Sequence, residues 1–135
     1  MDATHRRVLV VEDDEAIRVL VTGMLAEAGY AVRAATDGRE GLELLRGWRP
    51  DAIVLDVALP GMDGWAFREA QRRLPGAVDI PVVVVSGGHR LVAPSPELIP
   101  AAIVPKPFDV GELLATVARL VAYRPPGGRR DAAPV

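Results

Sequence analysis

Apolar residues in this chain gather in short continuous runs that alternate with longer amphipathic stretches. Four runs rich in β-branched side chains lie at 8–11, 52–55, 80–85 and 101–104, and a weaker one lies at 31–35. Strands of a parallel sheet that is covered on both faces appear in a sequence as continuous apolar runs rather than alternating ones. The pattern therefore predicts five strands in one buried parallel sheet.

The stretches between these runs have helical periodicity. In the first stretch, apolar residues recur at spacings of three and four, at Ile17, Leu20, Val21, Met24 and Leu25. Gly29 then predicts the end of this helix, because glycine readily adopts the left-handed conformation that follows a helix.

Three further helices have their own signals. Asp37 with Glu40, and Asp109 with Glu112, have the spacing of an N-cap residue and its capping partner. Another helix follows the Asp-Gly pair at 63–64, and its apolar positions are Ala66, Ala70 and Leu74. Strands that alternate with helices favour right-handed βαβ units. Five strands and about five helices fit an α/β, doubly wound parallel sheet of flavodoxin-like order 2-1-3-4-5.

One segment departs from this alternation. Between the fourth and fifth strands, Pro94, Pro96 and Pro100 remove amide donors and restrict the residues before them, so we expect the fourth helix to be short or irregular. The last residues, 124–135, are rich in Pro, Gly and Arg. We expect a single folded domain over 1–123, followed by a disordered tail or the start of a linker.

Composition narrows the class of protein. The 135 residues fit one domain, with 50% hydrophobic and 25% charged residues. A net charge of −2 gives no case for direct binding of nucleic acid, and the absence of cysteine excludes disulfides and thiolate metal sites. No apolar run has the length of a membrane span, and the first residues do not read as a signal peptide. We therefore expect a cytoplasmic protein without membrane contact.

Chemically useful side chains follow four of the predicted strands. The set comprises Glu12, Asp13, Asp14, Asp56, Ser86 and the sole lysine, Lys106. Each has an ordinary explanation when taken alone: an acid after a strand is often a helix N-cap, and a serine there is often a turn residue. Function in a doubly wound sheet nevertheless gathers at the carboxyl ends of its strands. Four compatible strand ends at one edge favour a functional site.

The charges at this edge indicate the chemistry. Neighbouring carboxylates repel, and a hard divalent cation such as Mg²⁺ relieves this repulsion through oxygen ligands. A carboxylate nucleophile, a lysine ammonium and a hydroxyl then suit phosphoryl transfer, because the cations neutralise charge on the phosphoryl oxygens.

At this point the segments VLVVEDD, DAIVLDVALPGMDGW, VVVVSG and VPKPF closely resemble the signature blocks of bacterial response-regulator receiver domains of the chemotaxis type. The resemblance covers about residues 7–122. It implies that Asp56 accepts a phosphoryl group from a histidine kinase or a histidine phosphotransfer protein in a two-component phosphorelay. It also implies a signalling phosphoprotein rather than an enzyme, with only Mg²⁺-dependent self-phosphorylation and autodephosphorylation. Its output partner is a protein that the sequence does not identify.

The same resemblance implies roles for other residues. Glu12 and Asp13 form the acidic pair that binds Mg²⁺ or Mn²⁺ together with Asp56, with Asp13 the closer ligand, and the backbone carbonyl of Ala58 is a further ligand. Ser86 is the switch hydroxyl. Lys106 contacts the phosphoryl group, and its bond to Pro107 is expected to be cis.

Two features depart from the family pattern. Receivers usually carry an aromatic residue three positions before the lysine, where this chain has Ile103. The proline-containing segment also lies where the family normally has its fourth helix. We therefore expect phosphorylation to be retained and its coupling to output to be atypical.

Three other functions remain open from the sequence. The first is a receiver-like interaction module that acts without phosphorylation. The second is a haloacid-dehalogenase-like phosphatase, which would need an acid where this chain has Ala58. The third is a flavin or dinucleotide binder, which would need a glycine-rich loop after the first strand, where three acids stand instead.

Overall fold

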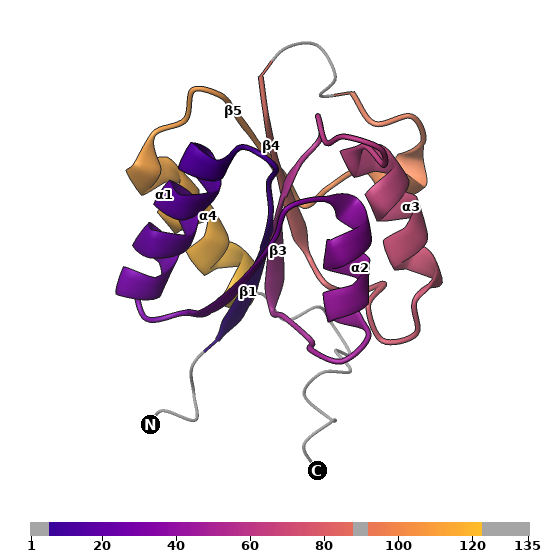
Figure 1. Ribbon diagram of the computed structural model, residues 1–135, viewed down its shortest axis with the longest axis horizontal. Helices are drawn as coiled ribbons and strands as arrows, with labels where there is room; N and C mark the ends of the chain where they lie inside the picture. The colour runs from indigo at the N-terminus through magenta and orange to yellow at the C-terminus, as the bar shows by residue number, and fades with distance from the viewer. Residues whose placement is uncertain (1–5, 88–91, 123–135) are drawn as a thin grey trace.

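Five parallel strands form one sheet in the order β2-β1-β3-β4-β5 in the computed structural model, which describes residues 6–87 and 92–122 (Figure 1). The strands are β1 (Arg7–Val11), β2 (Ala31–Ala35), β3 (Ala52–Asp56), β4 (Val82–Ser86) and β5 (Ala102–Pro105). The predicted sheet and its strand order are confirmed. The predicted start of the fourth strand at residue 80 is wrong, because the Ile80 amide closes a turn by donating to Ala77.

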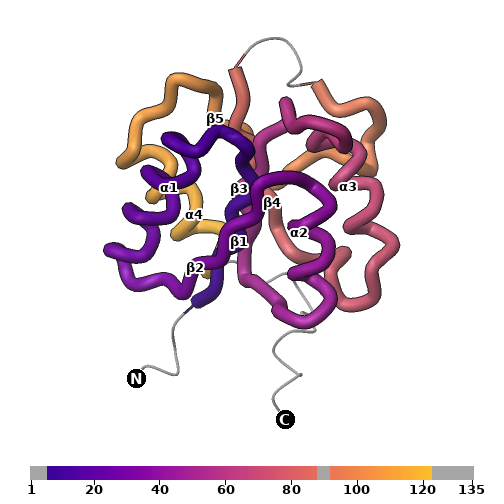
Figure 2. Tube along the Cα trace, viewed as in Figure 1, coloured from indigo at the N-terminus to yellow at the C-terminus, as the bar shows by residue number. Residues whose placement is uncertain are grey.

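Helices cover both faces of the sheet (Figures 1 and 2). Among the described residues there are four α-helices: α1 (Glu15–Glu27), α2 (Gly38–Leu45), α3 (Gly64–Arg73) and α4 (Val110–Ala122). The helices α1 and α4 lie on one face, and α2 and α3 lie on the other. The fourth of the five expected helices is a single 3₁₀ turn, η2 (Pro96–Leu98), so the prediction of a short or irregular element there is confirmed.

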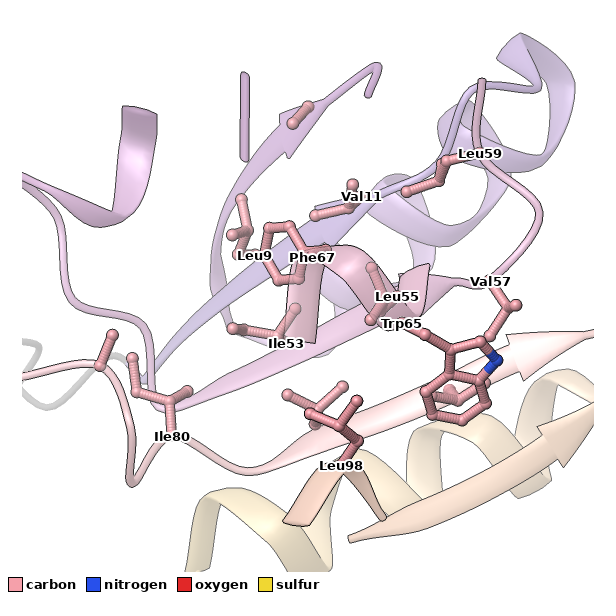
Figure 3. Packing of buried hydrophobic residues seen from close by; sticks show 14 of the residues in the cluster. Leu9, Val11, Ile53, Leu55, Val57, Leu59, Trp65, Phe67, Ile80 and Leu98 are labelled. Atoms are coloured by element: carbon pink, nitrogen blue, oxygen red, sulfur yellow. The ribbon is translucent and has the colours of Figure 1, made fainter. Parts of the chain in front are cut away.

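The sheet separates two hydrophobic cores. In β3, Ile53 and Leu55 face the core beneath α2 and α3, whereas Ala52 and Val54 face the core beneath α1 and α4. Figure 3 shows the first core, where Phe67 of α3 packs over the strands. Every residue of β3 and β4 is buried, which explains why these strands appear in the sequence as continuous apolar runs.

Aspartates cap the helices at the end that faces the carboxyl edge of the sheet. The side chain of Asp14 accepts a hydrogen bond from the Ile17 amide at 3.0 Å, and that of Asp37 accepts one from the Glu40 amide at 2.8 Å. Asp109 similarly caps α4. The caps predicted at Asp37 and Asp109 are confirmed, and Asp14 proves to be a cap rather than part of the acidic cluster. These caps fix where each helix begins, next to the strand ends.

One face of α3 differs from its sequence pattern. Ala66, which marks the helix by its spacing from Ala70 and Leu74, is exposed. The helix instead turns Phe67, together with the polar side chains of Arg68 and Gln71, toward the interior.

Over residues 6–87 and 92–122, no helix is long and apolar enough to cross a membrane. The predicted tail at 124–135, and with it the domain boundary after residue 123, lies outside the described residues.

Candidate functional site

The carboxyl edge of the sheet brings three acids and the lysine together. Glu12 and Asp13 follow β1, Asp56 ends β3, and Lys106 follows β5. Carboxylate oxygens of the three acids lie within 4.8 Å of one another. The Nζ atom of Lys106 lies 3.2 Å from Oε1 of Glu12 and 3.2 Å from Oδ2 of Asp56. The site thus holds one ammonium among three carboxylates.

Two of these carboxylates are buried, and each of their four oxygen atoms has a polar contact. The exposed fraction is 4% for Glu12 and 5% for Asp56, whereas Asp13 is exposed. Besides its contact with the lysine, each buried carboxylate accepts a hydrogen bond from a backbone amide. The Asp14 amide donates to Oε2 of Glu12 at 3.1 Å, and the Ala58 amide donates to Oδ1 of Asp56 at 3.0 Å. These four contacts fix both carboxylates in place.

Two groups of the site, Glu12 and Lys106, have a raised pKa. Burial, with a further contribution from the negative charge of Asp56, raises the pKa of Glu12 to about 7, against a lowering effect of the hydrogen bond from Asp14. For Lys106, burial lowers the pKa, but the charges of Asp56 and Glu12 outweigh it, so the pKa is raised. Burial thus favours the protonated form of Glu12 in a pocket where one lysine faces three carboxylates.

Ser86 stands beside the acids at the end of β4. Val85 is the register partner of Asp56, so Ser86 is one residue further along the neighbouring strand. Its side chain is buried, and its hydroxyl donates to the carbonyl of Gly87 at 3.3 Å. The Lys106 amide donates to the carbonyl of Ser86 at 3.0 Å, and the Lys106–Pro107 bond is cis, as expected.

A glycine allows α3 to begin directly against the end of β3. The Gly64 amide donates to the carbonyl of Val57 at 2.8 Å. A Cβ atom at position 64 would lie 2.6 Å from Cα of Val57 and 2.9 Å from the carbonyl oxygen of Asp56. The Asp-Gly pair at 63–64 is thus more than a turn signal, because only glycine fits this close approach.

Sequence reasoning did not identify Arg18 as a residue of this site. Its Nη1 donates to the carbonyls of Glu12 at 3.1 Å and Asp13 at 3.3 Å, so it holds the backbone that carries both acids. In the sequence, Arg18 is simply a polar residue in an amphipathic helix, and no spacing signal distinguishes it.

Known proteins resemble this chain in both sequence and structure. Response regulator MprA of Mycolicibacterium vanbaalenii is 39% identical over 89% of this chain and 52% of its own length. Protein Rrf1 of Nitratidesulfovibrio vulgaris is 37% identical over 86% of this chain and 83% of its own length. The chain therefore spans about half the length of the MprA relatives and most of the length of Rrf1.

Solved structures of response regulators also resemble this chain. A putative response regulator from Chloroflexus aurantiacus superposes with a TM-score of 0.81 at 30% identity, covering 89% of this chain and all of that one. The chemotaxis response regulator CheY4 of Vibrio cholerae gives a TM-score of 0.76 at 33% identity, over 87% of this chain and 99% of that one.

The family model for the response regulator receiver domain matches residues 8–118 of this chain, which include all of the acids and the lysine of the site. The proteins similar to this chain include both a chemotaxis regulator and MprA, so the comparisons assign the family and not the chemotaxis subtype. The chain belongs to the response regulator receiver domain family, the signalling domain of two-component response regulators.

Proposed function

We propose that this receiver accepts a phosphoryl group on Asp56 from a histidine kinase or a histidine phosphotransfer protein, with Mg²⁺, and thereby changes its binding to an output protein. The observation that carries the proposal is the setting of the Asp56 carboxylate. It is buried at the carboxyl edge of the sheet, positioned by the Ala58 amide and contacted by the Lys106 ammonium. A fixed carboxylate beside a cation suits a nucleophile that receives a negatively charged phosphoryl group.

The residues present fit a magnesium ion. Mg²⁺ prefers oxygen ligands, and carboxylate oxygens of Glu12, Asp13 and Asp56 lie within 4.8 Å of one another. Burial above all, and also the negative charge of Asp56, raise the pKa of Glu12 to about 7, and a bound cation would favour the ionised form of this carboxylate. We infer that Asp13 and Asp56 hold the ion directly, that Glu12 supports it, and that the backbone carbonyl of Ala58 is a further ligand. Mn²⁺ would fit the same ligands. The ion, once bound, would neutralise charge on the phosphoryl oxygens.

The side chains of the chain then have distinct roles in the transfer. An oxygen of Asp56 attacks the phosphorus atom, a new P–O bond forms, and the P–N bond to the donor histidine breaks, so the imidazole leaves with the electron pair. Lys106, which contacts Asp56 before the reaction, would contact a phosphoryl oxygen after it. The hydroxyl of Ser86, which donates to Gly87 in this structure, would turn to donate to the attached phosphate.

The test is phosphorylation by a small donor. The folded protein is incubated with acetyl phosphate and Mg²⁺ and its intact mass is measured promptly. A single phosphoryl adduct that disappears with EDTA and in Asp56→Asn, but remains in the helix-cap variant Asp63→Asn, is the expected result. A folded protein that forms no adduct would contradict the proposal and favour a receiver-like module that acts without phosphorylation.

A further inference from the structure

The described residues that lead into β5, 92–101, are attached to α3 by a buried arginine. Within these residues the 3₁₀ turn η2 uses the carbonyls of Ser95 and Pro96, but because the prolines prevent a longer helix, the carbonyls of Leu98 and Ile99 receive no helical donor. Arg68 supplies the donors instead. Its Nε donates to the carbonyl of Leu98 at 3.2 Å, and its Nη2 donates to the carbonyl of Ile99 at 2.9 Å. One side chain of α3 thus replaces part of the bonding that a fourth helix would have made within itself.

Gln71 completes this attachment from the next turn of the helix. It is fully buried, its Oε1 accepts a hydrogen bond from Nη1 of Arg68 at 3.0 Å, and its Nε2 donates to the carbonyls of Ala77 at 2.9 Å and Ile80 at 3.1 Å. The polar pair therefore ties α3 both to the chain that leads into β4 and to the chain that leads into β5. We therefore expect both segments to move with α3 if the helix moves.

Arg68 carries its charge inside the protein without an acidic partner among the described residues. Only 8% of the residue is exposed, and its hydrogen bonds go to neutral oxygens. Burial, followed by the charge of Arg72, lowers its pKa. Burying a charge is costly, so the hydrogen bonds to the segment must contribute strongly for the arginine to remain there.

The other end of α3 lies against the proposed phosphoacceptor. Gly64 leaves no room for even a methyl group between the helix and the backbone of Asp56 and Val57. Gly64 and Arg68 are four residues apart, about one helical turn. Because this close-packed contact leaves no free space, we expect a displacement of the Asp56 backbone to move α3. Through Arg68, the helix would then move the backbone of Leu98 and Ile99.

Receivers usually carry an aromatic residue at position 103, whose ring can turn inward and couple the site to the surface. This chain has isoleucine there instead, with an exposed fraction of 42%, so that coupling is absent. The side chain of Ile99, in contrast, is 61% exposed while its carbonyl is bound by Arg68. We propose that Arg68 is the positioning residue that transmits the state of Asp56 to the surface around Ile99, in place of a fourth helix and an aromatic residue at position 103. This inference rests on the function proposed above.

The experiment compares hydrogen exchange of peptides covering 92–101 with and without Mg²⁺ and beryllium fluoride, an analogue of the phosphoryl group. The amides of Leu98, Ile99 and Ala101 are reporters, because each donates a backbone hydrogen bond. Occupancy of the site should fix the start of α3, so we expect protection of this segment to rise about fivefold in the wild-type chain.

Variants then test the arginine itself. Arg68→Met should abolish the rise and weaken the affinity for beryllium fluoride by the same factor, because coupling is reciprocal. Arg68→Lys keeps the charge and should retain part of the effect, and it replaces Arg68→Met if that variant does not fold. Arg72→Met removes an exposed charge from the same helix and should behave as the wild type. A purely structural arginine would change protection equally with and without the analogue.

Two outcomes would overturn the inference, and they are distinguishable. If acetyl phosphate forms an adduct on Asp56 but protection of 92–101 does not rise with the analogue, or rises equally in Arg68→Met, the coupling is wrong and the proposed function stands. If neither adduct formation nor analogue binding occurs in the folded chain, the proposed function fails and the coupling fails with it.

Discussion

Lys106 reaches Asp56 across a whole strand. The two residues belong to the ends of β5 and β3, which are separated in the sheet by β4, and yet Nζ of Lys106 lies 3.2 Å from Oδ2 of Asp56. The same ammonium lies 3.2 Å from Glu12, at the end of β1. One cation therefore links the ends of three strands and stabilises two buried carboxylates that would otherwise repel each other.

Replacement of this lysine should slow phosphorylation. In Lys106→Met, the ammonium that neutralises charge on the transferred group is lost, and we expect the initial rate of adduct formation with acetyl phosphate to fall about 100-fold. The rate is followed by intact mass at a fixed Mg²⁺ concentration. Arg119→Met, which removes an exposed cation from the last turn of α4, is the control and should react at the wild-type rate. An unchanged rate in Lys106→Met would remove the lysine from the mechanism.

The stability of the metal-free protein should depend on pH through Glu12. Its pKa is about 7 in the folded chain and near the ordinary 4.5 in the unfolded chain, so folding favours the protonated form. The stabilising contribution is therefore complete below the unfolded value and is lost as pH rises through about 7. We expect the free energy of unfolding of the wild type, relative to Glu12→Gln, to fall by up to about 3 kcal/mol over this window.

Urea denaturation in EDTA at several pH values measures this difference. Mg²⁺ should take the place of the proton, so adding it should stabilise the wild type more at about pH 8 than at about pH 5. A difference between wild type and Glu12→Gln that is constant with pH would show that Glu12 has an ordinary pKa in the folded protein.

Glycine at position 64 should be essential for packing. In Gly64→Ala, the new methyl group would meet the backbone of Asp56 and Val57, and we expect a loss of about 3 kcal/mol in the free energy of unfolding. Gly23 is the matched control, because it lies within α1 and a Cβ there meets nothing within 4 Å. Gly23→Ala should stabilise the protein by about 0.5–1 kcal/mol. Thermal unfolding of both variants decides the matter, and equal effects would refute the close contact.

The buried amide of Gln71 should contribute more to stability than the exposed side chain of Arg72, the next residue of α3. Gln71→Met keeps the approximate volume but leaves the carbonyl of Ile80 without the Gln71 donor and that of Ala77 with the Ile80 amide alone, and we expect a cost of about 2 kcal/mol. The exposed variant Arg72→Met should change stability by less than about 0.5 kcal/mol. Chemical denaturation of the two variants provides the comparison, and a neutral Gln71→Met would mean that water replaces the amide.

The sequence predicted those parts of the fold that depend on local pattern. Continuous apolar runs identified all five strands, and the spacing of Asp37 from Glu40 identified a helix start that the structure confirms. The acids and Lys106 could be placed at one edge because parallel strands end together, whatever the details of packing. The start of β4 was misplaced because Ile80 is as apolar as a strand residue, although its amide belongs to a turn.

Contacts between distant segments could not be predicted in this way. Arg68 and Gln71 are polar residues in the middle of a helix, and a pattern of hydrophobic positions assigns such residues to the solvent side. Their burial depends on hydrogen bonds to carbonyl groups at positions 77, 80, 98 and 99. The sequence of α3 itself contains no signal for these contacts. Arg18 was missed for the same reason, because its partners are backbone oxygens rather than side chains.

The way in which Arg68 binds its segment has an evolutionary consequence. Its guanidinium holds this segment through the main-chain oxygens of Leu98 and Ile99, and every amino acid offers the same oxygen. The outward-facing side chain at position 99 can therefore be exchanged without loosening the attachment. A lineage could diversify what this surface recognises, residue by residue, while the arginine preserves the scaffold on which each new side chain is displayed.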